Sequence, residues 1–157
     1  MTDQTDRDGF ELSATRRTLP MALLRLRERV MAEFRPIMSE HGVTEQQWRV
    51  LRVLMEVAEI DATELAERAS ILAPSLSRIL KTLDGRGHIA MGRSPGDARR
   101  TLIRLTPEGE AYIRVMTPKS AAVYDRIEGL IGRERIQVLL DEIEAALEAL
   151  DQDDRSS

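Results

Sequence analysis

The chain has 157 residues, of which 42% are hydrophobic and 32% charged, the balance of one soluble globular domain. It has no cysteine, which excludes disulfides, thiolate metal sites and thiol-based sensing of oxidants. The net charge of -4 argues against a uniformly basic nucleic-acid binder. The many helix-forming residues, and few aromatic ones, favour a mainly helical fold.

The two ends of the chain lack the periodicity of folded elements. We expect residues 1–17 to form a flexible arm and residues 151–157 a disordered tail. No stretch is as apolar as the roughly 18 residues that a membrane span needs, which predicts a cytoplasmic protein with no membrane partner. A single folded domain is expected over residues 18–150.

The first predicted helix covers about residues 18–41. Pro36 removes one amide and predicts a bend close by, and His41-Gly42 ends the helix. The apolar residues recur every three or four positions and form one stripe, made of Leu19, Leu23, Leu26, Val30, Phe34 and Ile37.

Three further helices are predicted before residue 90. The segment Thr44-Glu-Gln-Gln47 has the form of a capping box and starts a buried helix. Asp61 caps a short third helix, and Ser70-Ile-Leu72 turns the chain. Pro74 suits the first position of the fourth helix, where a missing amide costs nothing.

The fourth helix has two contrasting faces. At 100° per residue its apolar residues fall in one narrow sector, comprising Leu76, Ile79, Leu80 and Leu83. The opposite face carries hydroxyl and cationic groups, with Ser77, Arg78 and Lys81 flanked by Ser75 and Thr82.

A β-hairpin with a basic tip is predicted next, with strands over residues 88–93 and 101–105 around the loop 94–100. Between residues 75 and 104, seven Lys and Arg face two Asp, giving this window a charge of +5 and the rest of the chain -9. The order helix, turn, helix and basic hairpin is that of a winged helix-turn-helix. Hydroxyl and cationic groups can reach base edges and phosphates, and Arg99 or Arg100 at the tip suits the minor groove.

The region of residues 107–150 is predicted to be helical. One helix starts at Thr106-Pro-Glu108 and runs to about Leu130, with Pro118 expected to bend or interrupt it. The last helix carries a seam like that of a coiled coil, which calls for a partner helix, at Ile136, Leu140, Ile143, Leu147 and Leu150.

The wing motif, Asp97-x-Arg99 followed by Leu105-Thr106, and the helix start Pro74-Ser-Leu-Ser-Arg78 resemble the MarR family of bacterial transcription factors. The resemblance covers about residues 18–150, although Pro118 departs from the family pattern. A narrower similarity to repressors of homoprotocatechuate degradation is carried by Leu23-Leu24, Arg27-Glu28, Phe34-Arg-Pro36, His41-Gly42 and Thr44-Glu-Gln-Gln-Trp-Arg-Val50.

The family resemblance implies a homodimer whose first and last helices interlock and whose winged regions, about residues 44–105, read a pseudo-palindromic double-stranded DNA. It implies that Asp97 holds the wing arginines and that Arg99 enters the minor groove. The candidate DNA-binding residues are Ser75, Ser77, Arg78, Lys81, Thr82, Arg93, Asp97, Arg99 and Arg100.

The same resemblance implies a cleft for a small aromatic carboxylate between the winged region and the terminal helices. Arg27, His41, Trp48 and Arg49 are chemically suited to it, because guanidinium pairs with carboxylate and indole packs on an aromatic ring. Simpler alternatives remain open for three of them. Trp48 also suits the core, His41 a helix end, and Arg27 a solvated surface, since neither Val30 nor Met31 can pair with it.

No motif of an enzyme is present: the sequence has no HExxH, no glycine-rich phosphate loop, no GxSxG and only two histidines far apart. We therefore predict no catalytic residue, metal or cofactor. The fold expected is mainly α with a small β-hairpin, and the function is that of a dimeric DNA-binding repressor of an aromatic catabolic operon. The alternative is a helical dimerisation scaffold without specific DNA recognition.

Overall fold

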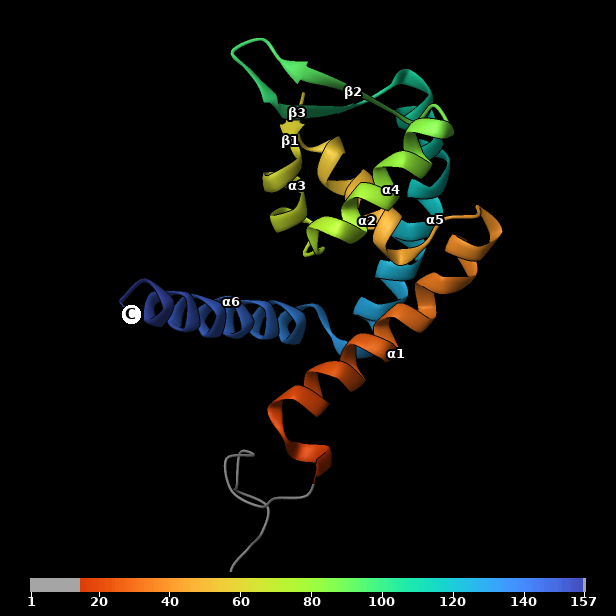
Figure 1. Ribbon diagram of the computed structural model, residues 1–157. Helices are drawn as coiled ribbons and strands as arrows, with labels where there is room; N and C mark the ends of the chain where they lie inside the picture. The colour runs from red at the N-terminus through yellow and green to blue at the C-terminus, as the bar shows by residue number, and fades with distance from the viewer. Residues whose placement is uncertain (1–14, 157) are drawn as a thin grey trace, which may run out of the picture. The chain divides into compact units, whose positions relative to one another are not determined.

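The computed structural model describes residues 15–156 and is mainly helical, with one small sheet (Figure 1). It divides into two compact units, one ending at Lys119 and the other beginning at Ser120. Most of the predicted N-terminal arm lies outside the described residues, but Thr15–Arg17 form a short 3-10 helix, η1. No helix of the described part is long and apolar enough to cross a membrane.

Helix α1 (Leu19–Glu40) continues through Pro36 and ends at the cap residue His41. Gly42, with φ of 65°, adopts the left-handed conformation that commonly ends a helix and that glycine adopts without steric cost. The apolar stripe is buried only toward its C-terminal half, where Phe34 and Met38 lie in the core.

Helix α2 (Glu45–Met55) forms the centre of the first unit. Its predicted capping box is present: the Gln47 amide donates to Thr44 Oγ1, and the Gln47 side chain accepts from the Thr44 amide, both at 3.1 Å. Two faces of the helix are apolar and both are covered, which buries Val50, Leu51, Val53 and Leu54.

The helix-turn-helix consists of α3 (Ala62–Arg68) and α4 (Ala73–Gly85). Asp61 caps α3 as predicted, its carboxylate accepting from the Glu64 amide at 2.9 Å. Helix α4 begins one residue earlier than predicted, so that Pro74 holds the second rather than the first position. Either position tolerates proline because the first amides of a helix have no partner within it.

The sheet has three antiparallel strands in the order β1 (Ile60–Asp61), β3 (Asp97–Leu105) and β2 (Ile89–Ser94). The predicted hairpin is confirmed, but its loop was predicted too long. Asp97 pairs with Ser94 across the tip, so residues 97–100 belong to the strand. Strand β1 is not predicted from the sequence, because its two residues are too few to show a period-two pattern.

Helix α5 (Pro107–Ile131) runs from the first unit into the second. Of the bend or interruption predicted at Pro118, the interruption is wrong, because the helix is continuous there. Proline removes a single amide, and beside it the Thr117 hydroxyl donates to the Ile113 carbonyl at 3.0 Å, which adds a bond to the same turn.

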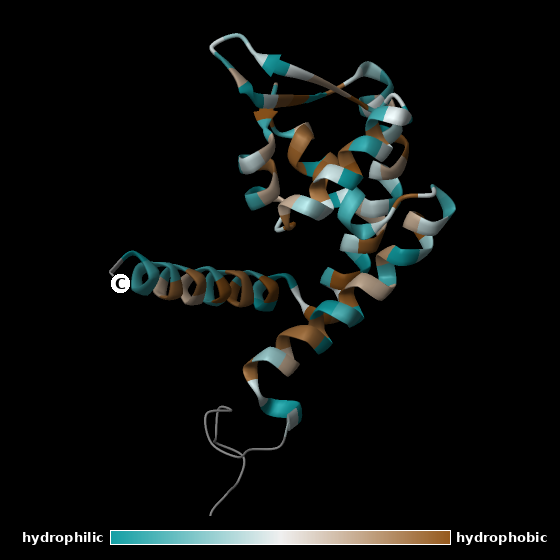
Figure 2. Cartoon of the chain, in the orientation of Figure 1, coloured by the Kyte–Doolittle hydropathy of each residue, from teal (hydrophilic) through white to brown (hydrophobic). Residues whose placement is uncertain are grey.

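Helix α6 (Arg133–Ser156) extends beyond the predicted end at Leu150. Residues 151–155 contain neither glycine nor proline, so nothing in them stops the helix, and the predicted disordered tail is instead helical up to Ser156. Figure 2 shows brown apolar ribbon along α6. Several of its apolar side chains are exposed within this chain, namely Val138, Leu139, Leu140, Leu147 and Leu150.

Candidate nucleic-acid interface

Helix α4 has the two faces that its sequence predicts. The apolar side is buried in the first unit, with Leu83 fully covered and Leu76 2% exposed. Ser77, Arg78 and Lys81 are exposed on the other side together with Thr82, while Ser75 is half-buried. The packing of the inner side fixes the outer side as a rigid surface of hydroxyl and cationic groups.

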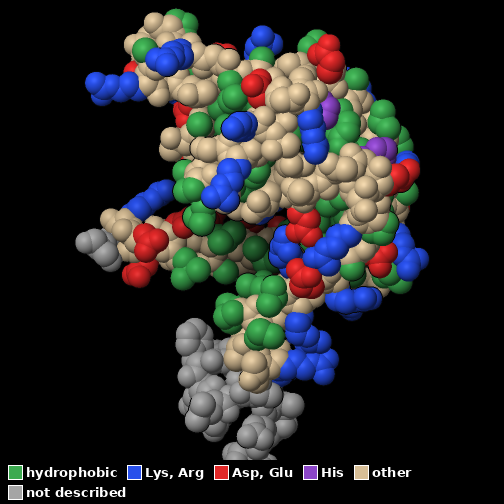
Figure 3. Space-filling view, turned by 45° about the vertical axis from the view of Figure 1, so that its right-hand side comes forward, with side chains coloured by type: hydrophobic (Ala, Val, Ile, Leu, Met, Phe, Trp, Pro, Cys, Tyr) green, Lys and Arg blue, Asp and Glu red, His purple; other side chains and the backbone are tan. Residues whose placement is uncertain are grey.

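The hydroxyl groups of this surface are oriented by the helix itself. Ser77 donates to the Ala73 carbonyl at 3.3 Å and Thr82 to the Arg78 carbonyl at 3.1 Å. Their oxygen lone pairs stay available as acceptors. Among the described residues neither Arg78 nor Lys81 forms an ion pair, so both are exposed, unpaired cations. Figure 3 shows Lys and Arg side chains, in blue, standing out over the region of α4 and the sheet.

The tip of the wing is held by hydrogen bonds to its backbone. Asp97 Oδ1 accepts from the Arg99 amide at 2.9 Å, and Arg93 donates to the Ala98 carbonyl at 3.4 Å. Asp97 therefore positions the backbone of Arg99, which leaves the exposed guanidinium of Arg99 free of that carboxylate.

Arg100 differs from its neighbour. Its guanidinium donates to Asp61 Oδ2 at 2.7 Å, and Asp61 at the same time caps α3. The Glu64 amide and then Arg100 hold the pKa of Asp61 below its ordinary value. The sequence-based placement of Arg99 and Arg100 in the loop is thus wrong, because both lie in β3, and Arg100 in addition links the wing to the helix-turn-helix.

One cation of the basic window faces away from this surface. Arg86, just after α4, donates to the Gly42 carbonyl at 3.0 Å and so ties the end of α4 to the turn between α1 and α2. A shallow hollow separates α4 from the sheet, and it is lined by Ala62, Ser77, Leu80, Lys81, Asp84, Met91 and Thr101.

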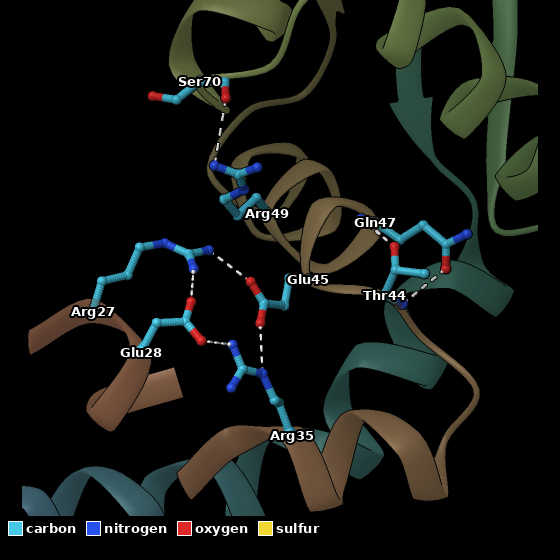
Figure 4. Close-up of polar contacts among 8 residues, drawn as sticks. All are labelled: Arg27, Glu28, Arg35, Thr44, Glu45, Gln47, Arg49 and Ser70. Carbon is cyan, nitrogen blue, oxygen red and sulfur yellow. Dashed lines mark hydrogen bonds and ion pairs between the residues drawn. The ribbon is translucent and has the colours of Figure 1, made fainter. Parts of the chain in front are cut away.

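The candidate effector residue Arg27 takes part in an ion-pair cluster of four side chains (Figure 4). Arg27 donates to Glu45 at 2.6 Å and to Glu28 at 3.1 Å, while Arg35 donates to Glu28 at 2.7 Å and to Glu45 at 3.0 Å. Hydrogen bonds from Arg27 and then Arg35 lower the pKa of Glu45. Of the two alternatives left open for Arg27, the solvated surface residue fits its exposure, but its partners lie next to it and on α2 rather than three or four residues on.

Arg49 lies on α2 beside the α3–α4 turn. One terminal nitrogen is 3.4 Å from the Ser70 carbonyl, and the buried Nε has no partner in the described part of the chain (Figure 4). Among the arginines suggested for an effector, Arg49 is therefore the one with an unsatisfied donor. Trp48 is half-buried one residue earlier.

His41 lies at the other end of this region, at the end of α1. Its carbonyl accepts from the Tyr112 hydroxyl at 2.6 Å, and its Nε2 is 3.5 Å from Lys119 Nζ. Tyr112 in turn stacks on the other histidine, His88, with ring centroids 4.3 Å apart. The structure thus gives His41 a place in the joint between α1 and α5, and among the described residues no hydrogen bond or ion pair links it to Arg27, Trp48 or Arg49.

Residues 41–100 match the family model described as the MarR family. The chain is 42% identical to the homoprotocatechuate degradative operon repressor of Escherichia coli over 78% of its own length and 82% of that protein's. The chain belongs to the MarR family. The resemblance drawn from the wing and recognition-helix motifs is thereby confirmed, including its narrower part.

Two solved structures are similar over most of the chain. NadR in complex with 4-hydroxyphenylacetate has a TM-score of 0.78 at 34% identity and covers 86% of this chain and 98% of its own. CouR, a transcriptional repressor bound to a 23-mer DNA duplex, has a TM-score of 0.77 at 30% identity and covers 87% and 99%. This MarR protein is a transcriptional regulator with a DNA-binding winged helix.

Proposed function

We propose that this MarR protein is a homodimeric repressor that binds a pseudo-palindromic operator of an aromatic catabolic operon and is released by a small aromatic carboxylate. The observation that carries the proposal is the joined surface of α4 and the wing, where the exposed cations Arg78 and Lys81 have no carboxylate beside them in the described chain. Exposed cations grouped on one surface attract a polyanion, and their contacts with phosphates release the counterions of DNA. This points to DNA binding rather than catalysis.

In this proposal α4 lies in the major groove and the wing tip in the minor groove. The side chains of Ser75, Ser77, Arg78 and Thr82 face base edges, while Lys81 and Arg93 neutralise phosphates. Arg99 enters the minor groove, whose negative potential attracts guanidinium. Asp97 and Arg100 act through the position of the wing.

The proposed dimer follows from apolar surface left uncovered by the single chain. The N-terminal half of α1 exposes Leu19, Leu23, Leu24 and Leu26, with exposed fractions between 40% and 57%. On α6, Leu140 and Leu147 are each 50% exposed and Leu150 is 68% exposed. Exposed apolar stripes on two helices favour burial against a partner. A second copy of the chain carries the same two stripes and can bury them.

For the effector we propose Arg49 as the first carboxylate partner, because its buried Nε lacks an acceptor. Arg27 is the second candidate, because its charge is already paired with Glu28 and Glu45. Trp48 remains a candidate for contact with the aromatic ring of the ligand, and His41 for the edge of the site. The class of ligand is supported by the 4-hydroxyphenylacetate bound to NadR and by the name of the Escherichia coli repressor.

The test uses the duplex upstream of the protein's own gene, whose binding is followed by fluorescence anisotropy while 4-hydroxyphenylacetate is added. We expect specific binding that the acid weakens, whereas 4-(2-hydroxyethyl)phenol, which lacks the carboxylate, leaves it unchanged. A hundredfold loss of affinity requires about 2.7 kcal/mol of coupling. Binding no tighter than to unrelated DNA contradicts the proposal and favours a scaffold.

The site is tested with Arg49→Ala, which should abolish the response to the acid but leave DNA binding intact. Arg68→Ala is the matched control, because Arg68 pairs with Glu56 on the surface. The single tryptophan reports binding directly through its fluorescence. A response equal to wild type in Arg49→Ala would place the effector site elsewhere.

A further inference from the structure

Leu72 stands immediately before the recognition helix and is 78% exposed, more than any other large apolar side chain of the described residues. Single exposed leucines are common on protein surfaces. This one, however, stands at the N-terminal end of the helix whose exposed surface carries Ser77 and Arg78. Its position therefore needs an explanation in terms of what that surface binds.

The turn before α4 directs Leu72 outward. The Ser70 amide donates to the Glu67 carbonyl at 3.0 Å and the Ile71 amide to the Ala66 carbonyl at 2.9 Å. With Ser70 in the left-handed region, at φ of 51°, these two bonds form a Schellman motif. The motif places Ile71 in the core, at 8% exposure, and the next residue on the outside. Leu72 is thus held in place by the backbone.

Leucine is also a poor choice for the role that Leu72 has in the helix. It is the N-cap of α4 and gives no side-chain hydrogen bond, whereas Thr44 caps α2 and Asp61 caps α3 through their side chains. Ser, Thr, Asp or Asn at this position would stabilise the helix. Leu72 departs from the N-cap preference and exposes apolar area in the free protein. Such a residue suggests that its side chain contributes to binding DNA.

The major groove offers one apolar group, the C5-methyl of thymine. Recognition helices contact base edges with their N-terminal residues, which is where Leu72 lies. We propose that Leu72 is a specificity-determining residue that packs on a thymine methyl group in each operator half-site. The inference rests on the proposed DNA-binding function and adds to it a base that no hydroxyl or cation of α4 selects.

Uracil interference provides the test, because deoxyuridine removes only the C5-methyl group. The duplex upstream of the gene is prepared with scattered uracil in place of thymine, and the bound and free fractions are compared. Wild type should be weakened about fourfold by uracil at one position per half-site, the effect of uncovering about one methyl group. Leu72→Ala should bind the thymine duplex less tightly and be indifferent to uracil there.

Two further variants separate base contact from folding. Leu72→Ser introduces a capping hydroxyl, so it should melt at a higher temperature than wild type and still lose the uracil effect. Val115→Ala removes an apolar side chain of α5 that is 61% exposed and should keep the effect.

The failures of the two proposals are distinguishable. Wild type that shows no preference for the upstream duplex overturns the proposed function itself. Specific binding by wild type with no uracil effect, or with an equal effect in Leu72→Ala, overturns the role of Leu72 alone. Loss of the dimer in Leu72→Ala, seen by sedimentation, would assign the side chain to a protein contact and also overturn it.

Discussion

Helices α4 and α6 have similar amphipathic sequences and opposite surroundings. In α4 the apolar stripe is covered by the same chain, so Leu83 is fully buried. In α6 the stripe is left open, and Leu140 is 50% exposed. The pattern of apolar residues therefore determines which face of a helix is suited to burial. The topology of the chain determines whether other elements of the same chain bury that face.

The largest effect is expected when a charge is placed on each stripe. Leu83→Asp buries a carboxylate with no partner and should unfold the chain, because such burial costs several kcal/mol. Leu140→Asp should leave the chain folded and separate the dimer. Circular dichroism on heating and sedimentation at micromolar concentration distinguish the two outcomes. A dimeric Leu140→Asp protein would exclude this part of α6 from the interface.

Helix α5 allows the same comparison within one element. A Cβ atom at Gly109 would lie 2.0 Å from the His88 carbonyl oxygen, whereas one at Gly129 would meet nothing within 4 Å. Gly109→Ala should therefore cost about 1–3 kcal/mol or more, since backbone must move. Gly129→Ala should gain roughly 0.5–1 kcal/mol from helix propensity. Equal midpoints for both variants in urea would contradict the close packing at Gly109.

The packed region also contains a group sensitive to pH. Burial, and then the charge of Arg86, lowers the pKa of His88, whose Nδ1 is buried without a partner among the described residues. The unfolded chain therefore binds a proton more readily. The contribution of His88 is complete above its ordinary pKa of about 6.5 and is lost as the pH falls below that value.

We therefore expect the melting temperature to fall between pH 7.5 and 5.5. His88→Phe, which keeps a ring for Tyr112 to stack on, should flatten this dependence. Glu45 and Asp61 have lowered pKa values and stay ionised over this range, so they do not mask the effect. An unchanged slope in His88→Phe would show that His88 is not the group responsible.

The sequence predicted most of the fold because its signals are local. Capping residues such as Thr44 and Asp61, and the spacing of apolar residues in α4, act within a few positions of where they stand. Strand β1 was not predicted, because its two residues are extended only through their pairing with Leu102 and Ile103, which lie far away in the sequence. The motif residues also identified the family without any knowledge of contacts.

The partners of individual arginines could not be read in the same way. Arg27 meets Glu45 across 18 positions, and Arg100 meets Asp61 across 39. Such pairs depend on how elements pack, and the helical spacing rules used for Arg27 do not cover them. This is why the sequence predicted which face of α4 is exposed, while the different partners of neighbouring wing residues could not be predicted.

Arg99 and Arg100 give the finest test, since they are adjacent in sequence and differ in partner. If Arg99 neutralises DNA charge, Arg99→Ala should make the fall of log affinity with log salt less steep by about 0.9 per subunit, or roughly 1.8 for the proposed dimer. Arg100→Ala should leave that slope nearly unchanged and weaken binding by at most about 1 kcal/mol, because it loosens a partly exposed ion pair that positions the wing. Asp61→Asn keeps a capping side chain but removes the charge, so it should reproduce Arg100→Ala. Affinities for the duplex measured between 50 and about 300 mM NaCl give the salt slope of each variant. A slope reduced equally in both arginine variants would mean that Arg100 leaves Asp61 and contacts phosphate itself.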